Sequence, residues 1–163
     1  MPIPFLGTYD PNAVIISLVA PTGKIELSGW ADGEMLMLER NAEFFENKVG
    51  TRGEVSRAYN RDATCNFTIR LQATSPSIKA LEDIKVATSL LKVPPVMALT
   101  VTDPSSYETI VVAQCWIQKD PSRSYSNEVG IREYSFYGVT TITASNNAIN
   151  QLANVASITV PNG

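Results

Sequence analysis

The sequence contains no histidine, and this absence removes several classes of function. Without imidazole there is no Ser–His or Cys–His nucleophile, no His-ligated zinc and no histidine pH switch. Cysteine is nearly absent as well, because Cys65 and Cys115 are the only two. Two thiols cannot form a four-cysteine zinc site or a disulfide framework. We expect both to be free thiols in the core, where cysteine behaves as a small hydrophobic residue.

Charge is also scarce, since 18% of the residues are charged where about 25% is usual. The formal net charge of −3 and the isoelectric point near 5.0 argue against phosphate-driven binding of nucleic acid. No apolar run reaches the ~18 residues of a membrane helix, and residues 1–4 lack the basic region of a signal peptide. We therefore expect a soluble product of the cytoplasm with no membrane partner.

The residues that are abundant favour β-structure. Val, Ile and Thr number 14, 13 and 14, a bias toward β-branched side chains. Residues 63–72 alternate strictly between apolar and polar, which predicts a strand with one buried face. Similar patterns predict further strands at 13–20, 24–29, 35–38, 96–102, 109–118 and 129–143. A short helix or a loop is expected at 148–155, and a last strand at 157–160.

One segment predicts a helix. Ser75 can cap its start and Pro76 can occupy the first helical position, where the missing N–H has no cost. Apolar residues then follow at helical spacing, and the two prolines at 94 and 95 end the pattern. We expect this face to pack against a sheet, so the fold class is mainly β with one flanking α-helix. The apolar face comprises Ile78, Leu81, Ile84 and Leu91.

The segment 40–62 departs from the rest of the chain, because it holds nine of the 29 charges together with the aromatic pair Phe44 and Phe45. It reads either as a solvated loop or as an exposed hairpin around residues 50–53. Exposed adjacent aromatics are unfavourable unless something covers them, which favours a segment that docks on a neighbouring subunit. The residues expected to contact that subunit are Arg40, Phe44, Phe45, Arg52, Glu54, Arg57, Arg61 and Asp62.

Catalytic and binding alternatives are weak. A glycosidase needs only two carboxylates, and Asp32 with Glu34, or Glu43 with Glu46, could supply them. No other pattern supports either pair, so we expect no enzymatic activity, no cofactor and no metal. Trp30 and Trp116 could instead form a sugar-binding platform, although tryptophan in a strand more often packs in the core.

Several different short motifs follow one another along most of the chain. The first is Thr8-Tyr9-Asp10-Pro11. Two others, at 29–34 and 49–57, contain two glycines each, and a further one is Asn60-Arg61-Asp62. The segments that carry the pattern are 8–11, 29–34, 49–57, 60–62, 71–77, 113–117, 119–121 and 132–134.

In their order and spacing these motifs resemble the tail-tube proteins of contractile-tailed bacteriophages, a phage structural protein family. The resemblance implies a β-barrel or β-sandwich with one flanking helix, and a single tail-tube domain over residues 1–163. Within it, 40–62 would be a long charged inter-ring loop, and 144–163 would be a C-terminal extension beyond the recognised part.

The resemblance also implies a function without a catalytic site. Six copies would close into a ring, and rings would stack into the inner tube of a tail within the virion. Genomic DNA would pass through the lumen without specific binding, and Glu26, Glu34 and Glu39 are candidates to face that lumen. The partners would be further copies of the chain, the tail sheath protein, a tape measure protein, and baseplate and neck proteins.

Two other functions stay open at this point. One is a carbohydrate-binding β-sandwich of a host-adhesion apparatus, which would expose Trp30 or Trp116. The other is a tube initiator or terminator of the same tail, or a subunit of a related injection machine of bacterial origin.

Overall fold

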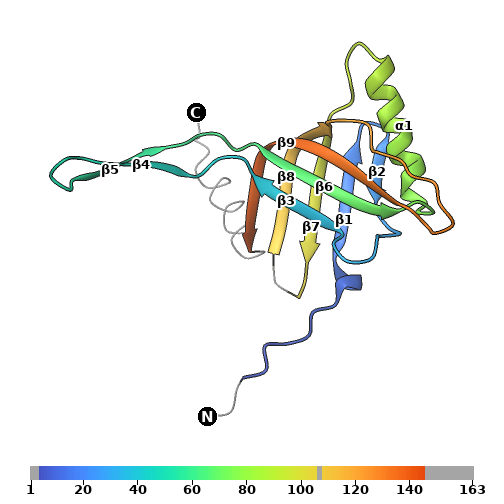
Figure 1. Cartoon of the computed structure of the whole chain (residues 1–163), viewed down its shortest axis with the longest axis horizontal. Helices are drawn as coiled ribbons and strands as arrows, with labels where there is room; N and C mark the ends of the chain where they lie inside the picture. The colour runs from blue at the N-terminus through green and yellow to red at the C-terminus, as the bar shows by residue number, and fades with distance from the viewer. Residues whose placement is uncertain (1–3, 106–107, 146–163) are drawn as a thin grey trace, which may run out of the picture.

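The computed structural model describes residues 4–105 and 108–145 (Figure 1). Nearly all of its regular structure is β-strand, as the composition predicts. A short 3-10 turn at Pro11–Ala13 precedes the first strand, and one α-helix interrupts the strands. In chain order the elements are β1 Ile15–Ala20, β2 Gly23–Glu26, β3 Leu36–Arg40, β4 Phe45–Val49, β5 Val55–Tyr59, β6 Cys65–Gln72, α1 Ser77–Leu90, β7 Met97–Asp103, β8 Glu108–Ile117 and β9 Ile131–Ser145.

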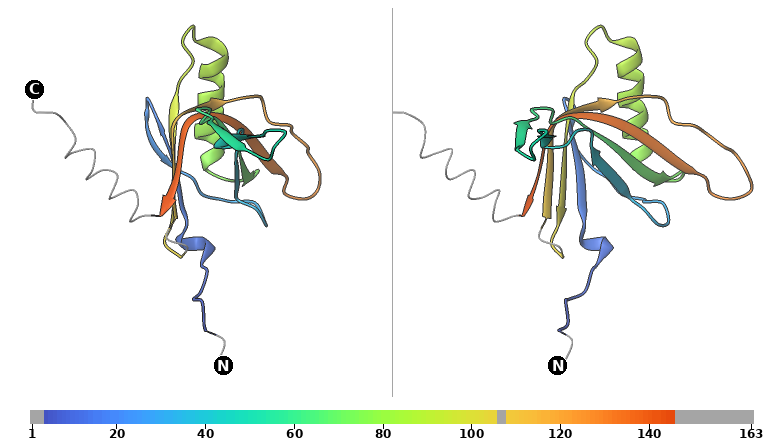
Figure 2. Two further views of the ribbon diagram at one scale, coloured as in Figure 1. Left: turned by 90° about the vertical axis from the view of Figure 1, so that its left-hand side faces the viewer. Right: turned by 60° about the vertical axis from the view of Figure 1, so that its left-hand side comes forward.

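Seven strands form one antiparallel sheet in the order β2-β1-β7-β8-β9-β6-β3. The sheet is rolled, so that β6 and β3 pass over the other strands (Figures 1 and 2). The chain after β2 runs along the end of β6, where the Gln72 N–H donates to the Gly29 carbonyl over 2.9 Å and Trp30 pairs with Leu71. The predicted mainly β fold with one helix is therefore confirmed, and the sheet is curved in the manner of an open barrel.

The core lies inside the roll. In β6 every second side chain is buried, which matches the alternation that predicted this strand. Phe67 on β6 stacks on Phe136 on β9, with ring centroids 4.8 Å apart. Leu81 and Ile84 of α1 complete the core from the end of the sheet next to β2. The predicted packing face of the helix is correct except for Leu91, which is exposed because α1 ends one residue earlier.

The start of α1 is tied to the β2–β3 connection through Ser75. Its hydroxyl accepts from the Ser77 N–H at 3.2 Å and donates to the Ser28 carbonyl at 2.5 Å. Pro76 stands at the N-cap, one position earlier than predicted. Gly29 has φ +72°, and a Cβ there would lie 2.7 Å from the Cβ of Ser75. This close approach and left-handed backbone require glycine at position 29.

Residues 45–59 form the hairpin β4–β5, which projects from the rolled sheet (Figure 1). Its turn is closed by the Gly50 N–H, which donates to the Glu54 carbonyl over 2.7 Å, and Gly53 takes φ +89°. Of the two readings of the charged segment, the exposed hairpin is the correct one.

The remaining sequence predictions differ from the structure mainly at element ends. The strand predicted over 24–29 ends at Glu26, because residues 29–31 turn to pair with β6. Residues 144 and 145 are the end of β9 rather than an extension, and the rest of the predicted extension, including 148–155 and 157–160, lies outside the described residues. No described helix has the length and apolarity needed to cross a membrane.

Candidate subunit-contact surfaces

At the hairpin, arginine side chains lie over the rings of two phenylalanine residues. Phe45 on β4 meets Tyr59 on β5 edge to face, with centroids 5.7 Å apart. The Arg57 guanidinium lies 4.5 Å above the Phe45 ring, and that of Arg40 lies 4.2 Å above the Phe44 ring. Such cation–π pairs contribute about 0.5–1 kcal/mol each at exposed sites. The structure therefore brings four of the predicted contact residues together, in two aromatic–arginine pairs.

Two predicted contact residues anchor the base of the hairpin. Arg40 donates from Nε to the Ala42 carbonyl at 3.0 Å and from its terminal nitrogen to the Asp62 carbonyl at 2.7 Å. The Asp62 carboxylate accepts from the hydroxyl and the backbone N–H of Thr64. The hydrogen bond from the Thr64 side chain is the main cause that lowers the pKa of Asp62. These contacts fix the direction in which the hairpin leaves the sheet.

One face of the hairpin carries two apolar cross-strand pairs, with Asn47 and Arg57 between them. Cross-strand pairing places Phe45 opposite Tyr59 and Val49 opposite Val55, and alternation puts both pairs on the same face. Val49 and Val55 are 70% and 68% exposed, and Tyr59 is 64% exposed. The sequence analysis missed these three residues, although the spacing of Val49 and Val55 about the 50–53 turn was a usable signal. Arg52 and Glu54 lie at the tip of the hairpin, and Arg61 is exposed at its base.

A second surface is a cavity of about 1050 Å³ at the end of the rolled sheet, where residues 9–16 enter β1 and the connection 26–36 crosses from β2 to β3. Its wall includes Glu26 and Glu34, two of the three carboxylates predicted to face a lumen. Glu39 is exposed on β3 and is not part of that wall. That these three carboxylates face a lumen stays a prediction.

The two carboxylate pairs considered for catalysis lie in different parts of the molecule. Asp32 and Glu34 belong to the cavity wall, whereas Glu43 and Glu46 are exposed at the hairpin. Among residues 4–105 and 108–145, no three acidic or cysteine side chains are grouped so as to hold a metal ion.

The tryptophans and cysteines pack as predicted. Trp30 is half-buried against the core, and Trp116 is half-buried with its ring 5.5 Å from that of Tyr137. Cys65 and Cys115 are free and buried. Burial, followed by the neighbouring Cys65, raises the pKa of the Cys115 thiol to about 12. A thiol held protonated in this way is a poor nucleophile.

A polar cluster joins α1 to the chain between β8 and β9. Glu82 on α1 accepts from the Tyr134 hydroxyl at 2.8 Å, from Lys85 at 2.5 Å and from Arg123 at 2.9 Å. Lys85 also binds Asp120 at 3.0 Å. The cluster fastens the 118–130 connection to the helix.

Comparisons with known proteins identify the fold. No protein-family model matches the sequence, and no curated protein matches it significantly. The structure is similar to the tube-terminating cap of the anti-feeding prophage, with a TM-score of 0.54 at 12% identity over 89% of this chain and 96% of the other. It is equally similar, with a TM-score of 0.54 at 15% identity, to a chain of the PVC sheath-tube complex, an extracellular contractile injection system, over 85% and 92% of the two chains. A sheath/tube terminator of the PVC system gives 0.50 at 17% identity over 89% and 98%.

These similarities define the class of fold. The chain has the tail-tube type of fold found in components of contractile injection systems, so the fold that the resemblance implied is confirmed.

Proposed function

We propose that the chain is a structural, non-enzymatic subunit of the inner tube of a contractile phage tail or related injection apparatus. Six copies form a ring, and rings stack into a hollow conduit. Similarity along nearly the whole length of tube-cap and sheath-tube chains carries the proposal. In this proposal the whole chain acts as one tail-tube domain.

The hairpin supports assembly from identical copies. A two-stranded hairpin alone is at best marginally stable in water, and this one leaves Val49, Val55 and Tyr59 largely exposed. Contact with another copy would cover these apolar side chains, while the guanidinium groups of Arg52 and Arg61 would reach carboxylates of the neighbour. The low charge content fits a surface that is largely covered in the assembly.

The same proposal specifies partners and location. The tube subunit is made in the cytoplasm of a host bacterium and ends in the tail of the virion. There it meets the sheath outside, a tape measure protein inside, and baseplate and neck proteins at its ends. DNA passes through the lumen without specific binding.

A second role in the same apparatus is that of a terminator or cap. The match to the tube-terminating cap and to the sheath/tube terminator covers 96% and 98% of those chains. A terminator would form one closed ring that does not stack further on itself.

Negative-stain microscopy of the purified protein over a series of concentrations tests these roles. Long hollow cylinders support the tube, and isolated rings support the terminator. A particle that stays monomeric at every concentration, and is missing from the inner cylinder of intact tails, would overturn the proposal.

A further inference from the structure

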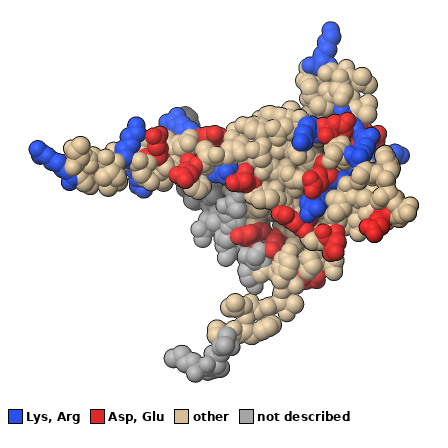
Figure 3. All heavy atoms as spheres, in the orientation of Figure 1, with Lys and Arg blue, Asp and Glu red and all other residues tan. Residues whose placement is uncertain are grey.

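The cavity at the end of the rolled sheet is distinctive in its charge. Its apolar floor includes Ile16, Leu27 and Trp30, and its wall adds five carboxylate side chains. No lysine or arginine is among the described residues that line it. Figure 3 shows acidic side chains gathered over the lower body of the molecule, away from the basic end of the hairpin. The carboxylates of the wall are those of Glu26, Asp32, Glu34, Asp103 and Glu108.

The tip of the hairpin has the complementary character. Residues 50–53 include two glycines, so Arg52 is the bulkiest and only charged side chain of the turn. Within the described part of the chain Arg52 makes no ion pair, and it is exposed. The tip is thus narrow and ends in an exposed guanidinium without an ion-pair partner, while the Glu54 carboxylate lies back over Gly50.

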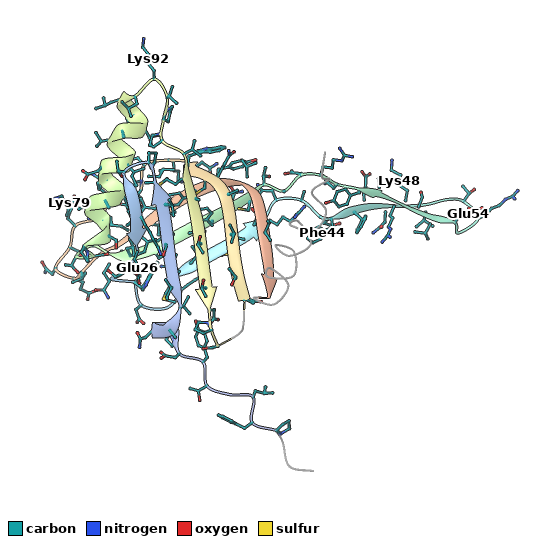
Figure 4. All side chains as sticks on the ribbon, turned by 180° about the vertical axis from the view of Figure 1, so that it is seen from behind. Glu26, Phe44, Lys48, Glu54, Lys79 and Lys92 are labelled. Carbon is teal, nitrogen blue, oxygen red and sulfur yellow. The ribbon has the colours of Figure 1, made fainter. Side chains whose placement is uncertain are left out.

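The tip and the cavity lie at opposite sides of the molecule. In Figure 4, Glu54 at the hairpin tip and Glu26 in the cavity wall are separated by the whole width of the sheet. The contacts of Arg40 at the hairpin base hold the hairpin in that direction. A hairpin tip of one copy therefore cannot occupy its own cavity without breaking this base.

We propose that the cavity is a socket for the hairpin tip of a second copy, with Arg52 of one subunit placed among Glu26, Asp32 and Glu34 of the next. This inference rests on the proposed function and adds the acceptor site to it. The opposite charges favour this register of the contact.

The contact joins two different surfaces, so it is heterologous. Such contacts either close into a ring or propagate as a stack, according to the rotation between copies. The strands of the hairpin are five residues long, and at about 3.3 Å per residue they place the tip some 16 Å from the base.

Cysteine cross-linking tests the docking directly. Arg52→Cys is combined in turn with Glu26→Cys, Asp32→Cys and Glu34→Cys, and assembled protein is oxidised and run on a denaturing gel. The native thiols are buried and do not interfere. We expect a ladder of linked chains for at least one pair, and none for the control pair Arg52→Cys with Lys79→Cys, since Lys79 is an exposed residue of α1.

Charge reversal gives an independent readout. Arg52→Glu should raise the concentration needed for assembly by about 30-fold, as expected when one member of a close charge pair across an interface is reversed. Adding Glu34→Arg to it should recover a large part of that loss. Lys92→Glu, which changes the net charge equally at an exposed site near α1, should leave assembly unchanged.

The possible failures are distinguishable. If the unaltered protein forms rings or tubes but no cavity position cross-links to the Arg52→Cys thiol, the docking site is wrong and the proposed function stands. If the unaltered protein never assembles, both are wrong. Equal effects of Arg52→Glu and Lys92→Glu would also overturn the docking site.

Discussion

At the scale of single residues, Gly138 shows how tightly the rolled sheet is packed. It lies on β9 between Cys65 on β6 and Cys115 on β8, in one row across three strands. A Cβ added to Gly138 would come within 2.5 Å of Val112 Cγ1 and 2.9 Å of Cys65 Sγ. Neither atom is at the end of a long flexible side chain, so the backbone of the neighbouring strands would have to shift. The sheet can curve closely here because these positions carry small side chains.

Gly138→Ala should therefore lower the free energy of unfolding by about 1–3 kcal/mol, the usual cost of overpacking a core. Urea denaturation monitored by tryptophan fluorescence measures the change. Combining it with Val112→Ala, which removes the closer clashing atom, should cost less than the sum of the two single changes. Additive losses, or a Gly138→Ala variant as stable as the unaltered chain, would contradict this packing.

At the scale of elements, the position of α1 depends on the polar cluster around Glu82. Tyr134 is fully buried in β9, and its hydroxyl reaches out of the core only to this carboxylate. Lys85 and Arg123 then connect Glu82 to the long 118–130 connection. One carboxylate thus joins helix, sheet and connection, which matters because the described connection has no helix or strand of its own.

Glu82→Leu should cost about 1–3 kcal/mol of unfolding free energy, because it leaves the Tyr134 hydroxyl buried without an acceptor. Tyr134→Phe in the same chain should recover part of that cost, since it removes the orphaned group. Thermal and urea unfolding of the two single variants and the double variant measure the coupling. A double variant that loses the full sum would show that the hydroxyl and the carboxylate act independently.

The cluster also predicts a dependence on pH. Burial acts to raise the pKa of Glu82, but the hydrogen bonds from Lys85 and Tyr134 and the charges of Lys85 and Arg123 outweigh it, so this pKa lies below its ordinary value of 4.5. A carboxyl with a depressed pKa stabilises the folded state above 4.5, and this contribution is lost as the pH falls below that value. Between pH 6 and pH 3, Glu82→Gln should therefore lose less stability than the unaltered chain does in parallel urea titrations. Equal losses would show that other groups dominate the acid response.

The sequence predicted elements well where the signal was local. The alternation in β6, the Ser75-Pro76 start of α1 and the glycines about residue 52 each specify structure within a few neighbouring positions. The cavity could not be predicted, because its wall combines Glu26 on β2 with Glu108 on β8, two strands that are far apart in the sequence and separated by β1 and β7 in the sheet. The pairing of Arg40 with Phe44 was equally hidden, since it depends on the angle at which the hairpin leaves β3.

At the scale of the whole molecule, the hairpin and the rolled sheet are separate pieces of structure. β4 and β5 form their own two-stranded sheet, outside the seven-stranded one. The large core side chains all come from the rolled sheet, its connections and α1. Folding of the body therefore does not require the hairpin, whereas assembly in our proposal does.

Replacing residues 46–58 by a two-residue Asn-Gly turn between Phe45 and Tyr59 should leave the melting temperature within a few degrees of its original value and abolish rings and tubes. Circular dichroism measures the first effect and sedimentation velocity the second. A shortened chain that still forms tubes of normal appearance would show that the hairpin is dispensable for assembly. A chain that no longer folds would contradict the separation of the two pieces.

In the proposed docking, the placement of tip and cavity on opposite sides gives the assembly a direction. A filament built through this contact exposes only tips at one extremity and only empty cavities at the other, so the two extremities cannot be chemically alike. A copy stripped of its hairpin could still receive an incoming tip while offering none, and would act as a chain stopper at a single end. Doping a small fraction of such copies into the unaltered protein would therefore shorten filaments in proportion to the dose.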